Sequence, residues 1–217
     1  MGNLEELRRN YAQGELSEQT ICDDPIEQFR VWFEHAQEAP SAEWFEANAM
    51  TLATSDETGF VTARIVLLKH YSAEGFAFFT NYRSIKGKQL EANPRASLVL
   101  YWPHVERQVR IDGTVVKADD QLSDRYFHAR PRGSQIGAVV SPQSAAIDSR
   151  DELIDKQNEL EARYSDQEIP RPDYWGGYLV QPLRIEFWQG RPNRLHDRLI
   201  FEREDTAAAW VRRRLAP

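Results

Sequence analysis

Two arginines and a histidine alternate near the carboxyl end of the chain, at Arg194, His196 and Arg198. An apolar run that ends in Trp188 precedes them, and a turn cluster of Gly, Pro and Asn separates the two runs, which predicts a β-hairpin. On the returning strand the three cations would share one face at a spacing of about 7 Å, because side chains alternate faces along a strand. Positive charges so placed repel one another unless an anion lies over them.

This stripe of cations has two readings. One is a charged edge strand that faces water. The other is a binding site, because the large flat ring of Trp188 beside a row of cations suits a planar anionic ligand. We predict a site for such a ligand here.

A second group of candidate binding residues lies in the middle of the chain. Tyr126 and Arg130 are four residues apart on a helix predicted over residues 120–129, so they project the same way. Pro131 ends that helix and Ser134 lies just beyond it. These three polar side chains are suited to hold a phosphate group, since Arg can bind two of its oxygens at once. A solvent-exposed Arg without a partner is the alternative.

Lys86 belongs to a helix that Ser84 is predicted to cap. Cations in the first turn of a helix oppose its dipole. The mismatch indicates an anion bound near Lys86.

The elements that must position these groups are short strands joined by tight turns, with helices at the periphery. The pattern favours an antiparallel barrel over a βαβ sheet. The run from 60 to 71 is rich in β-branched residues and is expected to be a central strand, with Arg64 and Lys69 on opposite faces. Further strands are predicted over residues 50–54, 76–81, 95–102 and 106–117. Helices are predicted over residues 4–12, from Pro25 with Asp24 as its N-cap, over 84–91, from Asp119-Asp120 to Ala129, and over 149–164.

Length and composition limit the possible classes of protein. The 217 residues suit one domain, which we expect to comprise a helical segment over residues 1–45 and a barrel with inserted helices over 46–217. The net charge of −7 argues against a nucleic-acid binder. The single cysteine, Cys22, can form neither an internal disulfide nor a zinc site, so we expect a reducing cytoplasm and no metal.

The sequence shows neither targeting segments nor the common nucleotide-binding motifs. The sequence has no apolar run long enough to span a bilayer and no signal-peptide pattern at its start, so we expect no membrane partner. It also has neither a Gly-x-Gly-x-x-Gly nor a Walker-type loop, which excludes a Rossmann or P-loop nucleotide site.

Several segments, taken together and in order, resemble the pyridoxine (pyridoxamine) 5′-phosphate oxidase family. They are Arg64-Ile-Val-Leu-Leu-Lys69, Glu106-Arg-Gln-Val, Tyr126-Phe-His-Ala-Arg-Pro-Arg-Gly-Ser-Gln-Ile-Gly, Gln143-Ser144, Phe187-Trp-Gln-Gly and Arg194-Leu-His-Asp-Arg198. The resemblance runs from Leu7-Arg8-Arg9 to the terminal Arg-Leu-Ala-Pro. It implies a split β-barrel that binds FMN in a cleft between the two subunits of a homodimer.

The resemblance also implies a role for individual residues. The implied FMN-binding residues are Arg64, Ile65, Val66, Leu67, Leu68, Lys69, Phe79, Thr80, Lys86, Gln108, Gln143, Ser144, Trp188 and Arg198. The implied substrate-binding residues are Arg8, Tyr11, Lys69, Tyr126, Arg130, Ser134, Arg194 and His196. We expect Arg194 and His196 to be catalytic, lying over the reacting carbon, orienting it and aiding departure of the proton.

Two positions depart from the family pattern. Ile85 stands where the family commonly has an Arg beside the Lys of its flavin-phosphate site, and Arg83 is the nearby cation that could compensate. Phe79 replaces a frequent Tyr and loses only its hydroxyl group.

The implied reaction is oxidation of pyridoxine or pyridoxamine 5′-phosphate at C4′ to pyridoxal 5′-phosphate. A hydride passes to FMN, and O2 then reoxidises the flavin to give H2O2. Three alternatives stay open: an FMN oxidase of phenazine biosynthesis, a non-catalytic module that binds flavin or pyridoxal phosphate, and a haem-handling split barrel. The phosphate-binding group of Tyr126, Arg130 and Ser134 argues against the first, and His196 between two arginines argues against the second. No histidine has an evident axial-ligand context, which leaves the third unsupported.

Overall fold

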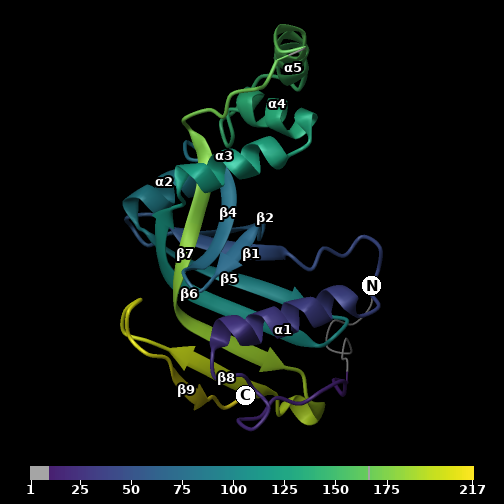
Figure 1. Cartoon of the computed structure of the whole chain (residues 1–217), viewed down its shortest axis with the longest axis vertical. Coiled ribbons are helices and arrows are strands. Elements are labelled where there is room, and N and C mark those ends of the chain that lie inside the picture. Colours follow the sequence, from purple (N-terminus) through teal and green to yellow (C-terminus); the bar gives the residue numbers. More distant parts are fainter. Residues whose placement is uncertain (1–9, 166) are drawn as a thin grey trace.

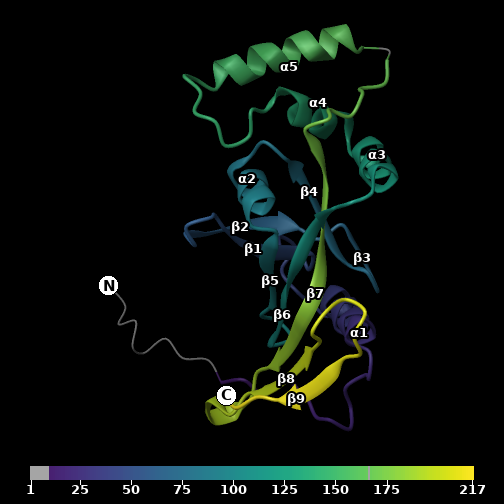
Figure 2. The same cartoon turned by 90° about the vertical axis from the view of Figure 1, so that its left-hand side faces the viewer.

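A curled antiparallel sheet organises the chain, and its longest strand, β7, connects the two ends of the molecule (Figures 1 and 2). The computed structural model describes residues 10–165 and 167–217. The strands are β1 (Ala49–Ser55), β2 (Val61–Leu67), β3 (His70–Ser72), β4 (Gly75–Asn81), β5 (Arg95–Trp102), β6 (Arg107–Lys117), β7 (Trp175–Gln189), β8 (Asp197–Glu202) and β9 (Val211–Arg214). The helices are α1 (Pro25–Glu38), α2 (Ile85–Ala92), α3 (Asp120–Ala129), α4 (Arg132–Val140) and α5 (Asp151–Arg163), with a 3-10 turn at Pro192–Arg194.

The sheet has the strand order β2-β1-β5-β6-β7-β4-β3, and β8 and β9 extend it beside β7. The first half of β7 pairs with β4, its middle and end pair with β6, and its last residues pair with β8. Pro182 lies within this central strand, where a proline normally removes a ladder hydrogen bond. The structure accommodates Pro182 because the register between β6 and β7 shifts between Asp112 and Gly113. The predicted class, mainly β with peripheral helices around an antiparallel split barrel, is confirmed.

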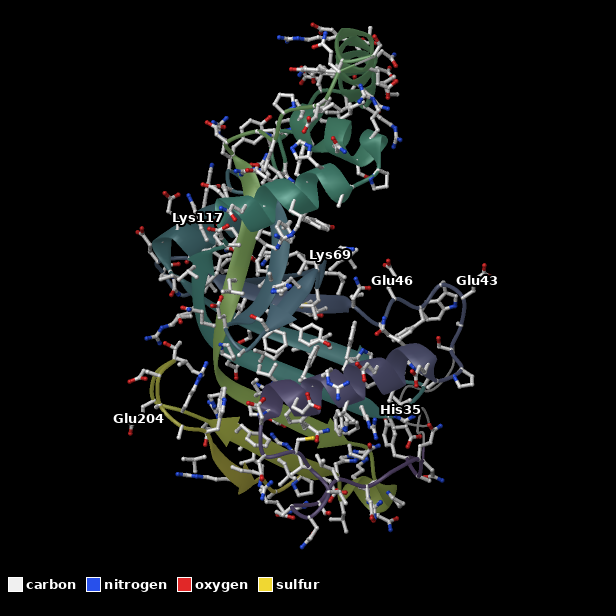
Figure 3. The ribbon with its side chains drawn as sticks, viewed as in Figure 1. His35, Glu43, Glu46, Lys69, Lys117 and Glu204 are labelled. Atoms are coloured by element: carbon white, nitrogen blue, oxygen red, sulfur yellow. The ribbon has the colours of Figure 1, made fainter. Side chains whose placement is uncertain are left out.

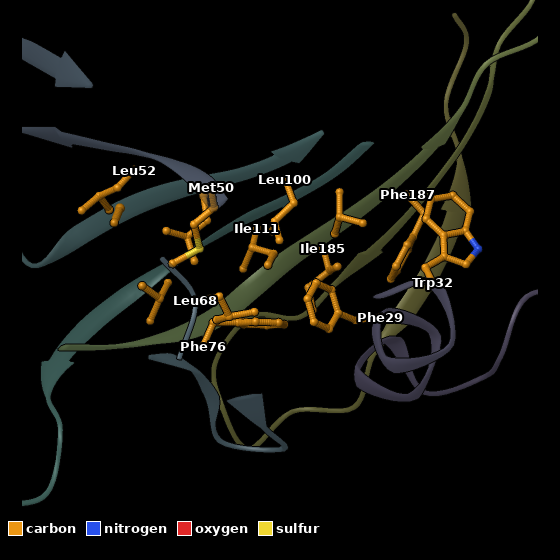
Figure 4. Close-up of a cluster of buried hydrophobic side chains, with 14 of the residues drawn as sticks. Phe29, Trp32, Met50, Leu52, Leu68, Phe76, Leu100, Ile111, Ile185 and Phe187 are labelled. Carbon is orange, nitrogen blue, oxygen red and sulfur yellow. The ribbon is translucent and has the colours of Figure 1, made fainter. Parts of the chain in front are cut away.

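The main core lies between the sheet and α1. Asp24 caps α1 through the amides of Ile26 and Glu27, and Pro25 occupies its first position, as predicted. The buried face of the helix presents Phe29 and Trp32 to the inner face of the sheet (Figure 4). The rings of Phe29 and Phe76 meet edge to face at 4.9 Å, and those of Trp32 and Phe187 do so at 5.3 Å.

A smaller core holds α3 and α4 against one end of β4 and β7. Its buried members are Phe127, Ile136, Ile169 and Trp175. The sequence predicted α3 but not α4, in which Gly133 and Gly137 weaken the helical signal. At the far end of this region α5 is held on one side only, and none of its residues is fully buried (Figure 2).

The prediction of one continuous central strand over residues 60–71 is wrong in two respects. The run divides into β2 and β3, because the Leu68 amide donates to Asn48 O while the next amide, of Lys69, donates to Ala77 O on the other side. In addition, β2 lies at the edge of the sheet, and Ile65 is 65% exposed. Val61 and Ile65 of β2 are therefore largely exposed, whereas Val66 packs against the main core.

Most of the other predicted strands and helices agree with the structure. The strands β1, β4, β5 and β6 and the helices α1, α2, α3 and α5 agree with the sequence to within a few residues. The helix predicted over residues 4–12 lies largely outside the described residues, and positions 10–12 carry no helix. That residues 1–217 form a single domain stays a prediction. Within residues 10–165 and 167–217, no helix has both the length and the apolar character needed to cross a membrane.

Candidate active site

A cavity of about 290 Å³ opens between β2, β4, α2 and α3. We call it the cationic cavity, because four positively charged side chains reach it and none of the described residues that line it carries a carboxylate. Its lining residues are Arg64, Ile65, Val66, Leu67, Lys69, Phe79, Thr80, Lys86, Tyr126, Arg130, Gln143 and Trp175. All of these except Trp175 are predicted site residues. The break after β2 explains why Arg64 and Lys69, predicted on opposite faces of one strand, line the same cavity.

Neutral oxygen atoms hold the guanidinium of Arg64. Its Nη1 donates to Thr54 Oγ1 at 2.6 Å and to Leu52 O at 3.2 Å, and its Nη2 donates to Thr62 Oγ1 at 2.5 Å. Burial lowers the pKa of Arg64. Hydroxyl and carbonyl groups orient the side chain without neutralising it, so its charge is available to an anion in the cavity.

Lys86 lies at the same end of the cavity. Its Nζ donates to Gln143 Oε1 at 2.9 Å and to Thr80 Oγ1 at 3.3 Å. Burial, together with the nearby charge of Arg64, lowers the pKa of Lys86 to about 8. A lysine whose pKa falls this far is one whose charge lacks a counter-ion, and an anion that binds beside it would supply one.

Stacked aromatic rings form another part of the cavity wall. Phe79 stacks on Tyr126 with ring centres 4.1 Å apart, and Trp175 continues the stack at 5.7 Å from Phe79. The guanidinium carbon of Arg130 lies 4.8 Å from the centre of the Trp175 ring. Lys69, labelled in Figure 3, extends from the β2–β3 break to within 5.9 Å of the Tyr126 ring centre.

Arg130 is incompletely paired. Its Nη1 atom is buried and has no hydrogen-bond partner in the part of the chain that the structure describes. Burial also lowers the pKa of this guanidinium. A buried donor without a partner is costly, so this atom indicates that a ligand completes the site.

The remaining candidates gather at the other end of β7. Here the rings of Tyr11, Trp188 and His196 contact one another, with centres 4.7 to 5.6 Å apart, and we call them the aromatic cluster. Gln108 on β6 and Arg198 on β8 lie opposite Trp188 in the two ladders. Of the residues predicted for this hairpin, Trp188, His196 and Arg198 therefore lie close to one another.

The predicted stripe of alternating cations is wrong, however. The strand β8 begins only at Asp197, and Asn193 and Arg194 adopt left-handed conformations with φ of 56° and 62°. Alternation therefore applies to Arg198 but not to Arg194 or His196. His196 is instead held by its own turn, where its Nδ1 accepts the Arg191 amide at 3.1 Å. Burial and the charge of Arg194 lower the pKa of His196.

Glu186 is a residue of this region that the sequence did not single out. It is 6% exposed, and its carboxylate accepts Arg198 Nε at 2.8 Å and Arg110 Nη1 at 3.4 Å. The pairing raises the pKa of Arg198 and fixes its guanidinium. A carboxylate two residues before Trp188 on the same strand face was the available signal.

Some predicted residues lie elsewhere. Leu68 is buried in the main core, and Ser134 is exposed on α4 outside the cavity lining. Ser144 lines a neighbouring cavity together with Arg83, which pairs with Asp173 at 3.7 Å and so does not compensate for Ile85 within the cationic cavity. Arg8 lies outside the described residues.

The cationic cavity and the aromatic cluster are far apart in one chain. Trp175 belongs to the first and Trp188 to the second, at opposite ends of β7. At about 3.3 Å per residue, the strand between them is on the order of 40 Å long. A single small ligand cannot touch both groups of one chain.

The fold and the cationic cavity define a split-barrel protein suited to anionic ring compounds. Comparison with known proteins identifies the family. A model of pyridoxamine 5′-phosphate oxidase matches residues 35–164, and a pyridoxine 5′-phosphate oxidase C-terminal dimerisation region matches residues 175–217. The chain belongs to the pyridoxamine 5′-phosphate oxidase family.

Relatives over the full length support this assignment. The pyridoxine/pyridoxamine 5′-phosphate oxidase of Salinibacter ruber is 54% identical over 100% of both chains, and that of Rhodopirellula baltica is 52% identical over 99% of this chain and 96% of its own. Among solved structures, PhzG from Burkholderia lata, in complex with tetrahydrophenazine-1-carboxylic acid, has a TM-score of 0.83 at 28% identity and covers 92% of this chain and 95% of its own. A related FMN-binding protein from Nostoc punctiforme shares the fold, with a TM-score of 0.69 at 17% identity over 91% of this chain and 100% of its own.

Proposed function

We propose that this protein oxidises pyridoxine 5′-phosphate or pyridoxamine 5′-phosphate to pyridoxal 5′-phosphate with FMN as its cofactor and O2 as the final electron acceptor. The observation that carries the proposal is the cationic cavity, in which four cations and a stack of aromatic rings surround a space without a carboxylate among the described lining residues. Two phosphorylated ring compounds, the flavin and the vitamer, are the ligands that such a site suits. The single cysteine is consistent with a cytoplasmic setting.

The residues present fit FMN. Arg64 and Lys86 offer charges that only neutral oxygens contact, at the end of the cavity suited to the flavin phosphate. The backbone of residues 65–67 lines the same cavity and would face the isoalloxazine ring. Trp188 of the aromatic cluster, with Gln108 and Arg198 opposite it on the neighbouring strands, would supply further contacts to the flavin. FMN, when bound, supplies the two-electron acceptor that takes a hydride from C4′.

The substrate phosphate would lie between Tyr126, Arg130 and Lys69. The unpartnered Nη1 of Arg130 points to an oxygen acceptor there, and Lys69 adds charge from the other side. Arg194 and His196 would lie over the reacting carbon. Because His196 Nδ1 already accepts the Arg191 amide, the neutral ring carries its proton on Nε2, from which it would donate to a polar atom of the substrate.

In a homodimer, the cationic cavity of one chain and the aromatic cluster of the other could form one site. The matched dimerisation region covers residues 175–217, which include β7, β8 and the aromatic cluster. The edge strand β2, which borders the cationic cavity, exposes Val61 and Ile65 at 62% and 65%. We propose that the aromatic cluster of one subunit meets the cationic cavity of its partner, and that two such sites form in each dimer.

Subunit complementation tests this arrangement. Assayed with pyridoxine 5′-phosphate well below the KM of the wild type, an Arg130→Ala chain and a His196→Asn chain should each have little activity alone, the first through its raised KM and the second through its lowered kcat. When they are unfolded together and refolded in equal amounts, half of the dimers would be hybrids with one intact site, which gives about one quarter of the wild-type activity. If each site belonged to one chain, the mixture would recover no activity, and that result would exclude the shared site.

The pKa of Lys86 predicts how FMN binding depends on pH. The Lys86 ammonium loses its proton near pH 8 in the free protein, and a bound phosphate would oppose that loss by raising this pKa. Affinity for FMN is therefore expected to be highest below pH 8 and to fall above it. Fluorescence titration with FMN between pH 6.5 and 9.5 measures this change. In Lys86→Met the affinity should be lower and the fall near pH 8 should vanish; a fall of equal size in the variant would contradict the assignment.

The proposed function is tested on the purified protein loaded with FMN. Under nitrogen, pyridoxine 5′-phosphate should bleach the visible flavin band, and admission of air should restore it with release of H2O2. Failure to take up FMN, or a loaded protein that no vitamer bleaches, would refute the proposal. A tetrahydrophenazine carboxylic acid is assayed beside it, because the structure of PhzG is similar; bleaching by that compound alone would identify a phenazine-type oxidase instead.

A further inference from the structure

The segment from residue 10 to residue 18 has no helix or strand, yet side chains from three distant parts of the chain hold its backbone. The amides of Ala12 and Gln13 donate to Glu106 Oε2 at 2.7 and 3.0 Å. Arg191 Nη1 donates to Gly14 O at 2.8 Å. The backbone of Leu16 makes two further hydrogen bonds. Its amide donates to Asp197 Oδ2 and its carbonyl accepts a hydrogen bond from Arg214 Nη2, both at 3.1 Å. We call residues 10–18 the N-terminal segment.

Glu106 is the residue that ties this segment to the hairpin of the aromatic cluster. It lies in the turn between β5 and β6, is 2% exposed and has a φ of 55°. Its carbonyl accepts the Gly190 amide at 2.8 Å and Gln189 Nε2 at 3.2 Å, while its carboxylate accepts the two amides of the N-terminal segment. One buried residue therefore joins three stretches of chain that are far apart in sequence. Its left-handed conformation is unfavourable for Glu, which indicates that the contacts outweigh the strain.

These contacts fix the ring of Tyr11. The ring lies on Gly190 so closely that a Cβ atom added there would approach ring atoms to 2.8 Å. It meets Trp188 and His196 edge to face, each at 5.6 Å between centres. Tyr11 therefore forms one wall beside His196, directly before the two amides that Glu106 holds.

We propose that Glu106 is a positioning residue for the substrate. By holding the amides of Ala12 and Gln13 it fixes Tyr11 beside His196, where the phenol ring forms part of the pocket for the phosphorylated pyridine ring. This inference rests on the proposed function. It assigns Glu106 and Gly190 a role in substrate affinity, although neither would touch the reacting atoms.

Two variants test the proposal by different routes. Glu106→Asn keeps a residue that tolerates the left-handed conformation, but its side chain is one methylene too short to reach the two amides. Gly190→Ala leaves Glu106 in place and displaces the Tyr11 ring. The control is Glu15→Gln in the same segment, whose carboxylate is exposed and lies 4.0 Å from Arg191. All are assayed as FMN-loaded enzymes with pyridoxine 5′-phosphate.

Both variants are expected to raise KM on the order of tenfold, with kcat and the dissociation constant of FMN within about twofold of wild type. Hydrogen exchange of amides 11–16 should accelerate in Glu106→Asn, while Glu15→Gln should resemble the wild type in every measurement. An unchanged KM in both variants would overturn the proposal, even if exchange accelerated, since the segment would then serve stability alone. An inactive wild-type enzyme would instead contradict the proposed function.

Discussion

Replacing Arg130 with Ala should raise KM for pyridoxine 5′-phosphate on the order of 10- to 100-fold. The reason is that Arg130 brings a buried, unpartnered donor to the cationic cavity, and a charge-assisted hydrogen bond to a phosphate contributes about 1.5–3 kcal/mol. The substrate phosphate would lose this contact equally in the ground and transition states. Steady-state kinetics should therefore show a raised KM with kcat changed far less.

Arg132→Ala is the matched control for this experiment. Arg132 is two residues away but donates to the carbonyls of Tyr164 and Gln167, and it does not line the cavity. Arg130→Lys should fall between the two, because Lys keeps the charge but not the paired donors of a guanidinium. If Arg130→Ala left KM unchanged, the phosphate would have to be held elsewhere.

The His196→Asn variant should show the second large effect, a fall in kcat of about 100-fold, the loss expected for a donor aimed at charge that develops in the reaction. The Asn side chain can still accept the Arg191 amide in place of Nδ1, but it has no atom at the position of Nε2. The dissociation constant of FMN should stay within about twofold of wild type. Rapid-mixing measurement of anaerobic flavin reduction isolates the affected step.

His196→Gln separates two roles for this ring. If Nε2 donates a hydrogen bond and orients the substrate, the Gln amide should restore part of the rate. If the ring must accept a proton, Gln should be as slow as Asn. The pKa of His196 is lowered by burial and by Arg194, so a donating neutral ring also predicts a kcat that is flat from pH 7 to 8.5. His128→Asn, at a histidine paired with Glu168 outside both groups, should match the wild type.

Much of the site could be predicted because its charges are unusual in an acidic chain. Arg64, Lys86 and Arg130 were identifiable as candidates from their place beside strands and helix ends, and the family resemblance joined them. The structure brings these three into one cavity. Local patterns sufficed because Arg64 lies in a strand, Lys86 lies in a helix and Arg130 directly follows a helix, and the sequence predicts the type of all three elements.

The predictions that the structure contradicts share one physical cause, because the tertiary structure overrides the local pattern on which each was based. Alternation along a strand failed for Arg194 and His196, because two left-handed residues delay the start of β8. The apolar composition of β2 predicts a central strand, whereas in this chain β2 lies at an edge of the sheet. The sequence marks Glu106 only as part of a family motif, since nothing local indicates that its carboxylate binds amides more than 90 residues earlier.

The length of β7 has a consequence for how the enzyme behaves when it is scarce. In the proposed dimer, each active site combines the cationic cavity of one chain with the aromatic cluster of the other, because these two groups lie at opposite ends of β7 in a single chain; an isolated chain would therefore be inactive. The activity per chain would then decline on dilution, and newly synthesised chains would be inactive until they dimerise. While most chains are still monomeric, the reaction rate would rise with the square of the chain concentration. The rate would therefore increase more steeply with concentration than that of a monomeric oxidase.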